Sequence, residues 1–203
     1  MSDPAVYHVA RSREKNWEAA EELTAFTFPW TDAEPPATRF RAFWTDDCLH
    51  FRFVVDDPDL VLDESPDPSQ AVLGSDRAEL FFATDRELSG HYYGLEMDPR
   101  GGVYEYRARH YREIDDSWTM PGLVVEGRRR EGGYEVVGEI PLDVLRDLDC
   151  LRNGRMVTGV YRAEFSHAAG GRVDEDWIAW VDPRTESPDF HVASSFGCFV
   201  FES

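Results

Sequence analysis

Apolar and polar side chains alternate along most of this chain with a period of two residues, the spacing that is typical of β-strands. The clearest case is Ala78–Phe82, where Leu80 and Phe82 fall on one face and Glu79 and Phe81 on the other. The same pattern predicts eleven strands: Tyr7–Ala10, Thr38–Trp44, Leu49–Val55, Ala78–Ala83, Tyr92–Met97, Val103–Arg109, Leu123–Arg129, Tyr134–Ile140, Val157–Phe165, Trp177–Trp180 and Cys198–Glu202. Such a chain is expected to be all-β.

Short turn sequences separate several of these strands and indicate that neighbouring strands pair as antiparallel hairpins. They include Asp46-Asp47, Arg100-Gly101-Gly102 and Gly132-Gly133. One helix is predicted, at Leu142–Leu148, and Asp56–Gln70 is expected to be a long surface excursion. We therefore predict a single domain over residues 1–203, an antiparallel β-sandwich of two stacked sheets with one short helix.

The composition is strongly acidic, with 40 Asp and Glu against 21 Lys and Arg and a formal net charge of −19. Such a polyanion repels nucleic acids and anionic membranes, so neither is expected as a partner. Lys15 is the only lysine. An acid-rich, lysine-poor surface suits a halophilic protein, which stays soluble at high salt. A preference for arginine codons is the competing explanation, and it does not account for the excess of acids.

The N-terminal residues and the cysteines bear on the cellular compartment. Met1–His8 has neither the basic nor the apolar segment of a secretory signal, and no apolar run approaches the ~20 residues of a membrane helix. The three cysteines, Cys48, Cys150 and Cys198, are odd in number and form no CxxC motif, so free thiols are expected. We expect a cytoplasmic protein in a salt-rich cytosol, and the oligomeric state stays open.

Charged residues interrupt the apolar pattern of two neighbouring predicted strands. Arg77 and Glu79 share one strand face with Phe81, and Glu96 interrupts the next strand. A face that combines an ion pair with an aromatic ring suits a polar ligand. The competing interpretation is an exposed Arg–Glu pair that stabilises the fold by less than about 1 kcal/mol.

Two loop segments combine an aromatic ring with charged neighbours, which is the composition of a platform for a sugar ring. One is Ser187–His191, which contains Phe190 and His191, and the other is Asp115–Trp118. For either segment alone, packing of the loop is the simpler explanation. The remaining histidines are scattered singly and are expected to lie at the surface or to be hydrogen-bonded.

Three acidic clusters have the oxygen ligands that a hard cation such as calcium prefers. They are Asp56-Asp57-Pro58-Asp59, Asp63-Glu64 and Asp174-Glu175-Asp176. None has the spacing of an EF-hand loop. A solvated acidic face is therefore the expected role of each cluster.

Taken together, several segments resemble the carbohydrate-binding module family 9-like group within the DOMON-like β-sandwiches. They occur in that family's order and span nearly the whole chain. The segments are Phe28-Pro29-Trp30, Phe40–Asp46 followed by Leu49-His50-Phe51, Val54–Pro58, Ser75–Phe82, Glu96–Gly101, Gly133–Leu142, Trp180–Pro183, and Pro188–His191 leading to Phe196-Gly197.

The resemblance implies a jelly-roll-like sandwich that binds mono- or oligosaccharides, with structural calcium in some members. In sugar-binding members two tryptophans hold the sugar ring, and their positions fall near Leu73, which is not aromatic, and at Phe190. The sugar-contacting glutamate of the family falls at Glu79, and Glu96 replaces a basic residue. No cofactor is expected apart from possible calcium.

We therefore predict a non-catalytic domain that binds a neutral saccharide through Arg77, Glu79, Glu96, Phe190 and His191. The first alternative is a haem-binding DOMON-type cytochrome domain. Its available ligands are Met97 and Met120 with His91 or His110. The second is a glycan-active hydrolase that uses Glu79, Glu96 or His191.

Overall fold

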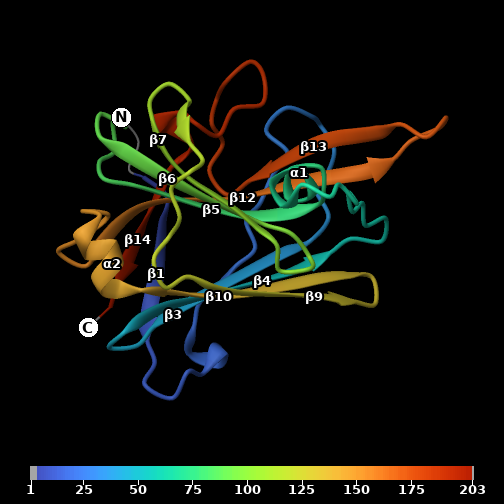
Figure 1. The fold of residues 1–203 in the computed structure, drawn as a ribbon. Coiled ribbons are helices and arrows are strands. Elements are labelled where there is room, and N and C mark those ends of the chain that lie inside the picture. The colour runs from blue at the N-terminus through green and yellow to red at the C-terminus, as the bar shows by residue number, and fades with distance from the viewer. Residues whose placement is uncertain (1–3, 203) are drawn as a thin grey trace.

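Two curved β-sheets lie one above the other in the computed structural model, which describes residues 4–202 (Figure 1). The upper sheet contains β5 (Arg77–Ala83), β6 (His91–Met97), β7 (Val103–Arg109), β8 (Glu113–Asp115), β11 (Leu151–Arg152), β12 (Arg155–His167), β13 (Val173–Ala179) and β14 (Gly197–Phe201). The lower sheet contains β2 (Glu22–Leu23), β3 (Thr38–Trp44), β4 (Cys48–Asp56), β9 (Val124–Arg130) and β10 (Gly133–Pro141). The β-sandwich prediction is confirmed.

Strand β1 (Val6–Arg11) joins the two sheets, because its first four residues pair with β14 and its last two pair with β3. Both pairings are parallel, with Val6 opposite Cys198 and Ala10 opposite Phe43. The other strand pairs in the described part of the chain are antiparallel. The prediction that all strands pair in antiparallel fashion was therefore wrong for β1.

Two short α-helices are present instead of the one that was predicted. Helix α2 (Leu142–Asp147) is the predicted helix, and helix α1 (Pro68–Leu73) begins within the last residues of the expected excursion. Asp67 caps α1 by accepting hydrogen bonds from two backbone N–H groups, and Pro68 occupies its first turn. Two 3₁₀ turns, η1 (Trp17–Ala19) and η2 (Ala193–Ser195), complete the elements, and no helix in residues 4–202 is long and apolar enough to cross a membrane.

The main core lies between the sheets, where alternate residues of each strand point inward. Leu80 and Phe82 of β5 belong to this core and are fully buried, as the alternation predicts. They meet phenylalanines of the lower sheet such as Phe40 and Phe53. Each fully buried side chain of this size stabilises the fold by about 1.5–3 kcal/mol relative to an exposed one.

A second apolar cluster covers the opposite, outer face of the upper sheet. It contains Phe81 of β5, Tyr106 of β7 and Tyr161 of β12, with Phe190 and Phe196 from the segment that precedes β14. Strand β5 is therefore buried on both faces. The candidate site lies on this outer face.

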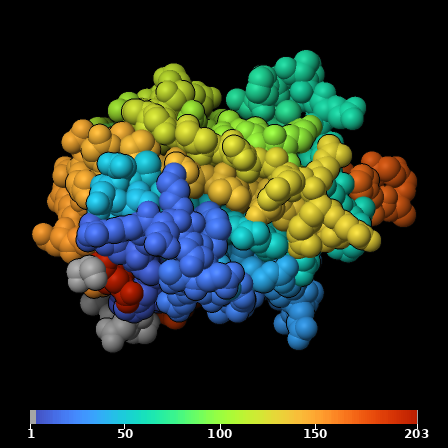
Figure 2. Space-filling view, turned by 90° about the horizontal axis from the view of Figure 1, so that it is seen from below, coloured from blue at the N-terminus to red at the C-terminus, as the bar shows by residue number. Residues whose placement is uncertain are grey.

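Charged side chains cover the outer face of the lower sheet, in contrast to the upper sheet. Arg39 pairs with Asp56 and Arg41 pairs with Glu22. Seen from below in Figure 2, the N-terminal third of the chain lies beside the β9–β10 hairpin on this side of the molecule.

Candidate functional site

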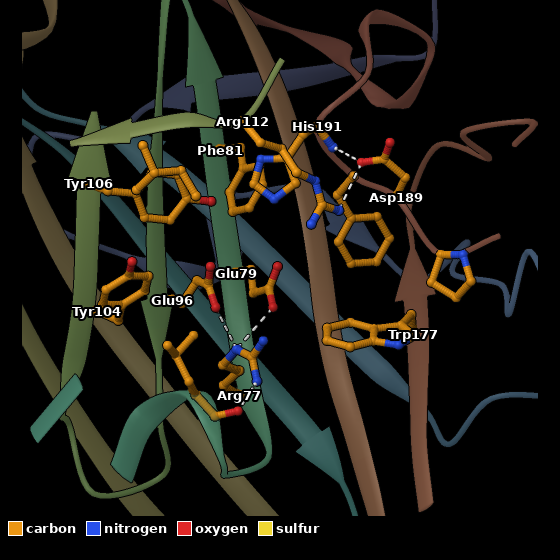
Figure 3. Close-up of a pocket in the computed structure, with 14 residues that line it drawn as sticks. Arg77, Glu79, Phe81, Glu96, Tyr104, Tyr106, Arg112, Trp177, Asp189 and His191 are labelled. Carbon is orange, nitrogen blue, oxygen red and sulfur yellow. Dashed lines mark hydrogen bonds and ion pairs between the residues drawn. The ribbon is translucent and has the colours of Figure 1, made fainter. Parts of the chain in front are cut away.

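A cleft of about 390 Å³ opens on the outer face of the upper sheet (Figure 3). Strands β5, β6, β7 and β13 contribute to its lining, together with the segment 188–191. The five residues predicted from the sequence all line this cleft: Arg77, Glu79, Glu96, Phe190 and His191. The fold therefore brings together residues that are up to 114 positions apart, from Arg77 to His191.

Three charged residues, which we call the cleft triad, form one end of the cleft. Arg77 and Glu79 lie two positions apart on β5, and Glu96 lies directly opposite Glu79 on β6. Arg77 Nε donates to Glu96 Oε2 at 2.6 Å and lies 3.1 Å from Glu79 Oε1. The three residues are only 4%, 2% and 5% exposed. The alternative of a solvent-exposed ion pair was therefore wrong.

Helix α1 and Trp177 hold the guanidinium of Arg77 in place. Arg77 Nη1 donates to the Leu73 carbonyl oxygen at the end of α1, at 2.9 Å. The guanidinium carbon lies 5.4 Å from the centroid of the Trp177 ring, within the range of a cation–π contact. Most of the donor groups of Arg77 are therefore already engaged by the protein itself.

Two polar atoms beside these charges have no hydrogen-bond partner within residues 4–202, namely Glu79 Oε1 and the Tyr106 hydroxyl. Burial, and next the charge of Glu96, raise the pKa of the Glu79 carboxyl. Burial also raises the pKa of Tyr106, which remains a phenol at neutral pH. Buried polar atoms normally find partners, so these two indicate that the cleft is built to receive a polar group.

Two half-buried aromatic residues, Trp177 from β13 and Tyr104 from β7, flank the cleft triad on opposite sides in Figure 3. Neither residue is among the site residues predicted from the sequence. Tyr104 lies directly opposite Glu96 on the neighbouring strand, so its side chain shares the face of that carboxylate. The alternation of β7 was the signal that would have found it.

Phe190 lines the cleft but does not stand free as an exposed plane. Its ring is 5% exposed and stacks on Tyr161 with a centroid distance of 4.2 Å and an interplanar angle of 10°. The Phe190 ring also packs edge-to-face against Trp177, with a distance of 6.0 Å between the ring centroids. Phe190 therefore supports the aromatic wall from behind, and Trp177 presents the more accessible ring.

His191 lies at the end of the cleft that is farther from Arg77 in Figure 3. Its Nδ1 is hydrogen-bonded to the Tyr92 hydroxyl at 2.9 Å, and its backbone N–H donates to Asp189 Oδ1 at 2.9 Å. Burial lowers the pKa of His191 to about 4, so the ring is neutral at neutral pH.

Asp189 links two loops at this same end of the cleft. Its Oδ2 accepts from the Tyr111 hydroxyl at 2.7 Å, and its Oδ1 accepts from Arg112 Nη2 at 3.1 Å. Arg112 is thus neutralised by Asp189. The free acceptor atoms of the cleft therefore lie at the opposite end, in the cleft triad.

A second group of charges, which we call the interior cluster, lies between the sheets and consists of Arg162, Asp57, Asp76 and Glu164. One oxygen atom of each acid lies within 4.8 Å of the others. Burial raises the pKa of both Asp57 and Asp76. Asp57 is 2% exposed, so the expectation of a solvated acidic face was wrong at this residue.

The interior cluster does not fit a calcium ion, although its acids are of the required type. Calcium takes six to eight oxygen ligands. Both carboxylate oxygens of Asp76 already accept backbone N–H groups, at 2.6 and 2.7 Å. The fully buried guanidinium of Arg162 pairs with Glu164 and donates to Thr38 Oγ1 at 3.0 Å. Arg162 therefore supplies the positive charge of this cluster.

The structure gives less support to the two alternative functions, the haem-binding domain and the glycan-active hydrolase, than to a saccharide-binding cleft. Met97 and His91 lie at opposite ends of β6, which at ~3.3 Å per residue separates them by roughly 20 Å, too far to share a haem iron. Met120 is buried in the core between the sheets. Glu79 and Glu96 share one nitrogen of Arg77, whereas glycoside hydrolases place two carboxyl groups on either side of the scissile bond.

A cleft that combines aromatic rings with a few polar groups has the usual composition of a small-molecule site. Residues 11–203 match the model of a family described as carbohydrate family 9 binding domain-like. The chain belongs to this family. No curated protein matches the sequence.

Three solved structures have a similar fold. A proposed carbohydrate-binding protein from Bacteroides uniformis ATCC 8492 has a TM-score of 0.71 and 14% identity, over 98% of this chain and 100% of its own. A family 9 module from Caldicellulosiruptor kristjanssonii in complex with glucose has a TM-score of 0.63 and 15% identity, over 98% and 96%. Its complex with cellotriose has a TM-score of 0.62 and 14% identity, over 98% and 94%.

Proposed function

We propose that the protein is a non-catalytic carbohydrate-binding domain that takes a mono- or oligosaccharide in the cleft. Membership of the carbohydrate family 9 binding domain-like family supports this function. The structurally similar module from Caldicellulosiruptor kristjanssonii is bound to glucose in one structure and to cellotriose in another.

The observation that carries the proposal is the position of Trp177 and Tyr104 on either side of the buried acids Glu79 and Glu96. A sugar ring offers apolar C–H faces, which pack against aromatic planes, and hydroxyl groups at its edge, which donate to carboxylates. The cleft supplies both kinds of contact in one place. Its volume of about 390 Å³ lies at the lower end of the range of small-molecule sites.

The expected affinity is modest, because few groups contact the ligand. Hydrogen bonds to a charged group contribute about 1.5–3 kcal/mol each, and burial of a sugar face against an aromatic ring adds to this. We expect dissociation constants of roughly 0.01–1 mM, which correspond to about 4–7 kcal/mol.

Calorimetry with a panel of mono- and disaccharides tests the proposal. At least one sugar is expected to bind in the stated range, with no release of reducing ends on prolonged incubation. Trp177→Ala and Glu79→Ala are each expected to weaken binding at least several-fold. Each variant removes one contact to the sugar, which contributes up to about 3 kcal/mol. Phe190→Ala is expected to weaken it too, through loss of support for the Trp177 ring.

Trp17→Ala is the matched control, because Trp17 is also half-buried but packs on Phe43 of the lower sheet. This variant is expected to bind as the wild type does. Unchanged affinity in both Trp177→Ala and Glu79→Ala would place the site elsewhere on the molecule. If no sugar in a broad panel binds at millimolar concentration, the proposed function is wrong.

A further inference from the structure

The cleft triad has more free acceptor atoms than free donor groups. Arg77 Nε donates to Glu96 and its Nη1 donates to the Leu73 carbonyl oxygen, so Nη2 is the guanidinium nitrogen without a hydrogen-bond partner among the described residues. Glu79 Oε1 receives no hydrogen bond from any residue in the range 4–202. A ligand group that complements this end of the cleft must therefore bring donors of its own.

The charges at this end cancel only while Glu79 keeps its proton. Two carboxylates, Glu79 and Glu96, face one guanidinium, Arg77, which leaves a net charge of −1 when both acids are ionised. The other arginine of the cleft, Arg112, is paired with Asp189. The chain as a whole carries a formal charge of −19, so no long-range positive field offsets this local excess.

The aromatic walls act in the same direction as the charge. The faces of Trp177 and Tyr104 carry negative quadrupole potential and attract cations that approach within about 6 Å. Trp177 already makes such a contact with Arg77, at 5.4 Å. A second cation that binds between these rings is stabilised by cation–π contacts with both of them.

We propose that the cleft prefers a saccharide that carries a protonated amine, an amino sugar, over the corresponding neutral sugar, with the ammonium group on Glu79 between Trp177 and Tyr104. This inference rests on the proposed function. An ammonium group has three donors and no acceptor, so it complements an acceptor-rich site. A charge-assisted contact to a buried carboxylate is about twice as strong as a neutral one.

If an ammonium group binds beside Glu79, a change in the protonation of Glu79 can be measured. Because burial raises its pKa, Glu79 holds a proton near neutral pH in the free protein. An ammonium group that binds beside it favours the ionised carboxylate. Binding of an amino sugar is therefore accompanied by release of a proton, and binding of a neutral sugar is not.

Calorimetry with glucose, glucosamine and N-acetylglucosamine tests the inference, at a pH of about 6.5, where an amine is largely protonated. Glucosamine is expected to bind at least about tenfold more tightly than glucose, a difference of about 1.4 kcal/mol. N-acetylglucosamine has an added group at the same position but no charge, and is expected to show no such gain. Repeating the glucosamine titration in buffers of different ionisation enthalpy is expected to reveal the released proton.

Glu79→Gln is expected to remove the preference for glucosamine and the proton release, so that glucosamine and glucose bind this variant with equal affinity. Glu126→Gln, at an exposed position of β9, makes the same change in net charge and is expected to leave the preference intact. The wild-type comparison of the three sugars stands even if Glu79→Gln does not fold.

Equal affinity for glucose and glucosamine would overturn the inference and leave the proposed function in place. Binding of none of the three sugars would overturn it as well, and the broader panel then decides on saccharide binding. Tighter binding of N-acetylglucosamine than of glucosamine would show that shape, and not charge, selects the ligand.

Discussion

The cleft triad and the interior cluster have similar compositions but lie on opposite faces of the same sheet. Each combines one buried arginine with at least two buried acids. Arg77 points outward, and Arg162, whose neighbour on β5 is Ala78, points into the space between the sheets. Alternation along β5 and β12 thus separates two similar sets of charges.

The two groups differ in what their unpaired atoms face. In the interior cluster, backbone N–H groups occupy both oxygens of Asp76, and Thr38 of the lower sheet accepts from Arg162. Asp57 Oδ2 and Arg162 Nε have no hydrogen-bond partner within the described residues, but both residues are buried. In the cleft triad, Glu79 Oε1 faces a cleft, and the described chain offers it only the ion pair with Arg77. Buried charges whose partners come from the chain itself hold the fold together. Where the chain leaves an acceptor free beside a cleft, we propose that the same residue types bind a ligand.

The largest expected effect is on stability, from removal of Arg162. Arg162→Met leaves the acids of the interior cluster buried without their cation, and breaking a buried ion pair typically costs about 3–5 kcal/mol. We expect a loss of this size in urea-induced unfolding monitored by tryptophan fluorescence. Sugar affinity of the folded fraction is expected to stay within a few-fold of the wild type.

Arg172→Met is the control for Arg162→Met, because the side chains of Arg172 and of its partner Asp174 are both more than half exposed. It is expected to cost less than about 1 kcal/mol. Added calcium is expected to leave the melting temperature of the wild type unchanged. A rise of several degrees with calcium, or a loss below about 1 kcal/mol in Arg162→Met, would refute the structural role assigned to Arg162.

The next effect concerns the pH dependence of stability, through Glu79. Burial raises its pKa to about 8 in the folded protein, and the unfolded value is about 4.3. Between these values the folded state binds more protons than the unfolded state, so the free energy of unfolding falls as the pH rises. Below about pH 4 the contribution of Glu79 is fully present, and it is lost by about pH 8.

Glu79→Gln cannot ionise, so its stability is expected to fall less than that of the wild type between about pH 5 and about pH 8, by about 1 kcal/mol or more. The pKa values of the buried Asp57 and Asp76 are also raised. Both residues are present in the variant and in the wild type, so they lower the free energy of unfolding of the two proteins equally as the pH rises. Urea unfolding at the two pH values measures the difference. Parallel declines in the two proteins would mean that Glu79 is ionised in the folded state throughout.

The smallest expected effect is a dependence of stability on salt, which arises from charges at the protein surface and not from the cleft triad or the interior cluster. A formal charge of −19 opposes compaction, and counterions relieve the repulsion. The melting temperature is expected to rise by several degrees between about 0.1 M and about 2 M KCl, because the Debye length falls from about 10 Å to below 3 Å. Glu79→Gln and the wild type are expected to gain equally, since the cleft triad is shielded from salt. Equal midpoints in the two salts would refute the halophile interpretation.

Local alternation was sufficient to predict most strands and the face shared by Arg77, Glu79 and Phe81, because the direction of a side chain along a strand depends only on its position. It could not predict that β1 pairs in parallel with β14, since nothing local specifies a partner about 190 residues away. The start of α1 was signalled by Asp67 and Pro68, but a helix of only six residues carries too little periodicity to recognise.

The aromatic walls show the same limit at the site. A tryptophan in a strand looks the same in the sequence whether it faces a core or a cleft, so the sequence did not single out Trp177 as a site residue. Phe190 stood beside charged residues in a loop, and its composition favoured an exposed ring. Tyr161, 29 positions earlier, instead covers that ring, and the contact arises only once β12 and the final loop are brought together.

The parallel pairing of β1 with β14 also determines how the domain responds to mechanical force. A pull on the N-terminal end of β1 and the C-terminal end of β14 drags two parallel strands lengthwise in opposite directions. The hydrogen bonds between Val6–Val9 and Cys198–Phe201 are then loaded together in shear, and none can open first as in a zipper. Strand β1 is held on its other side by β3 as well. The domain is therefore built to resist stretching between its two ends.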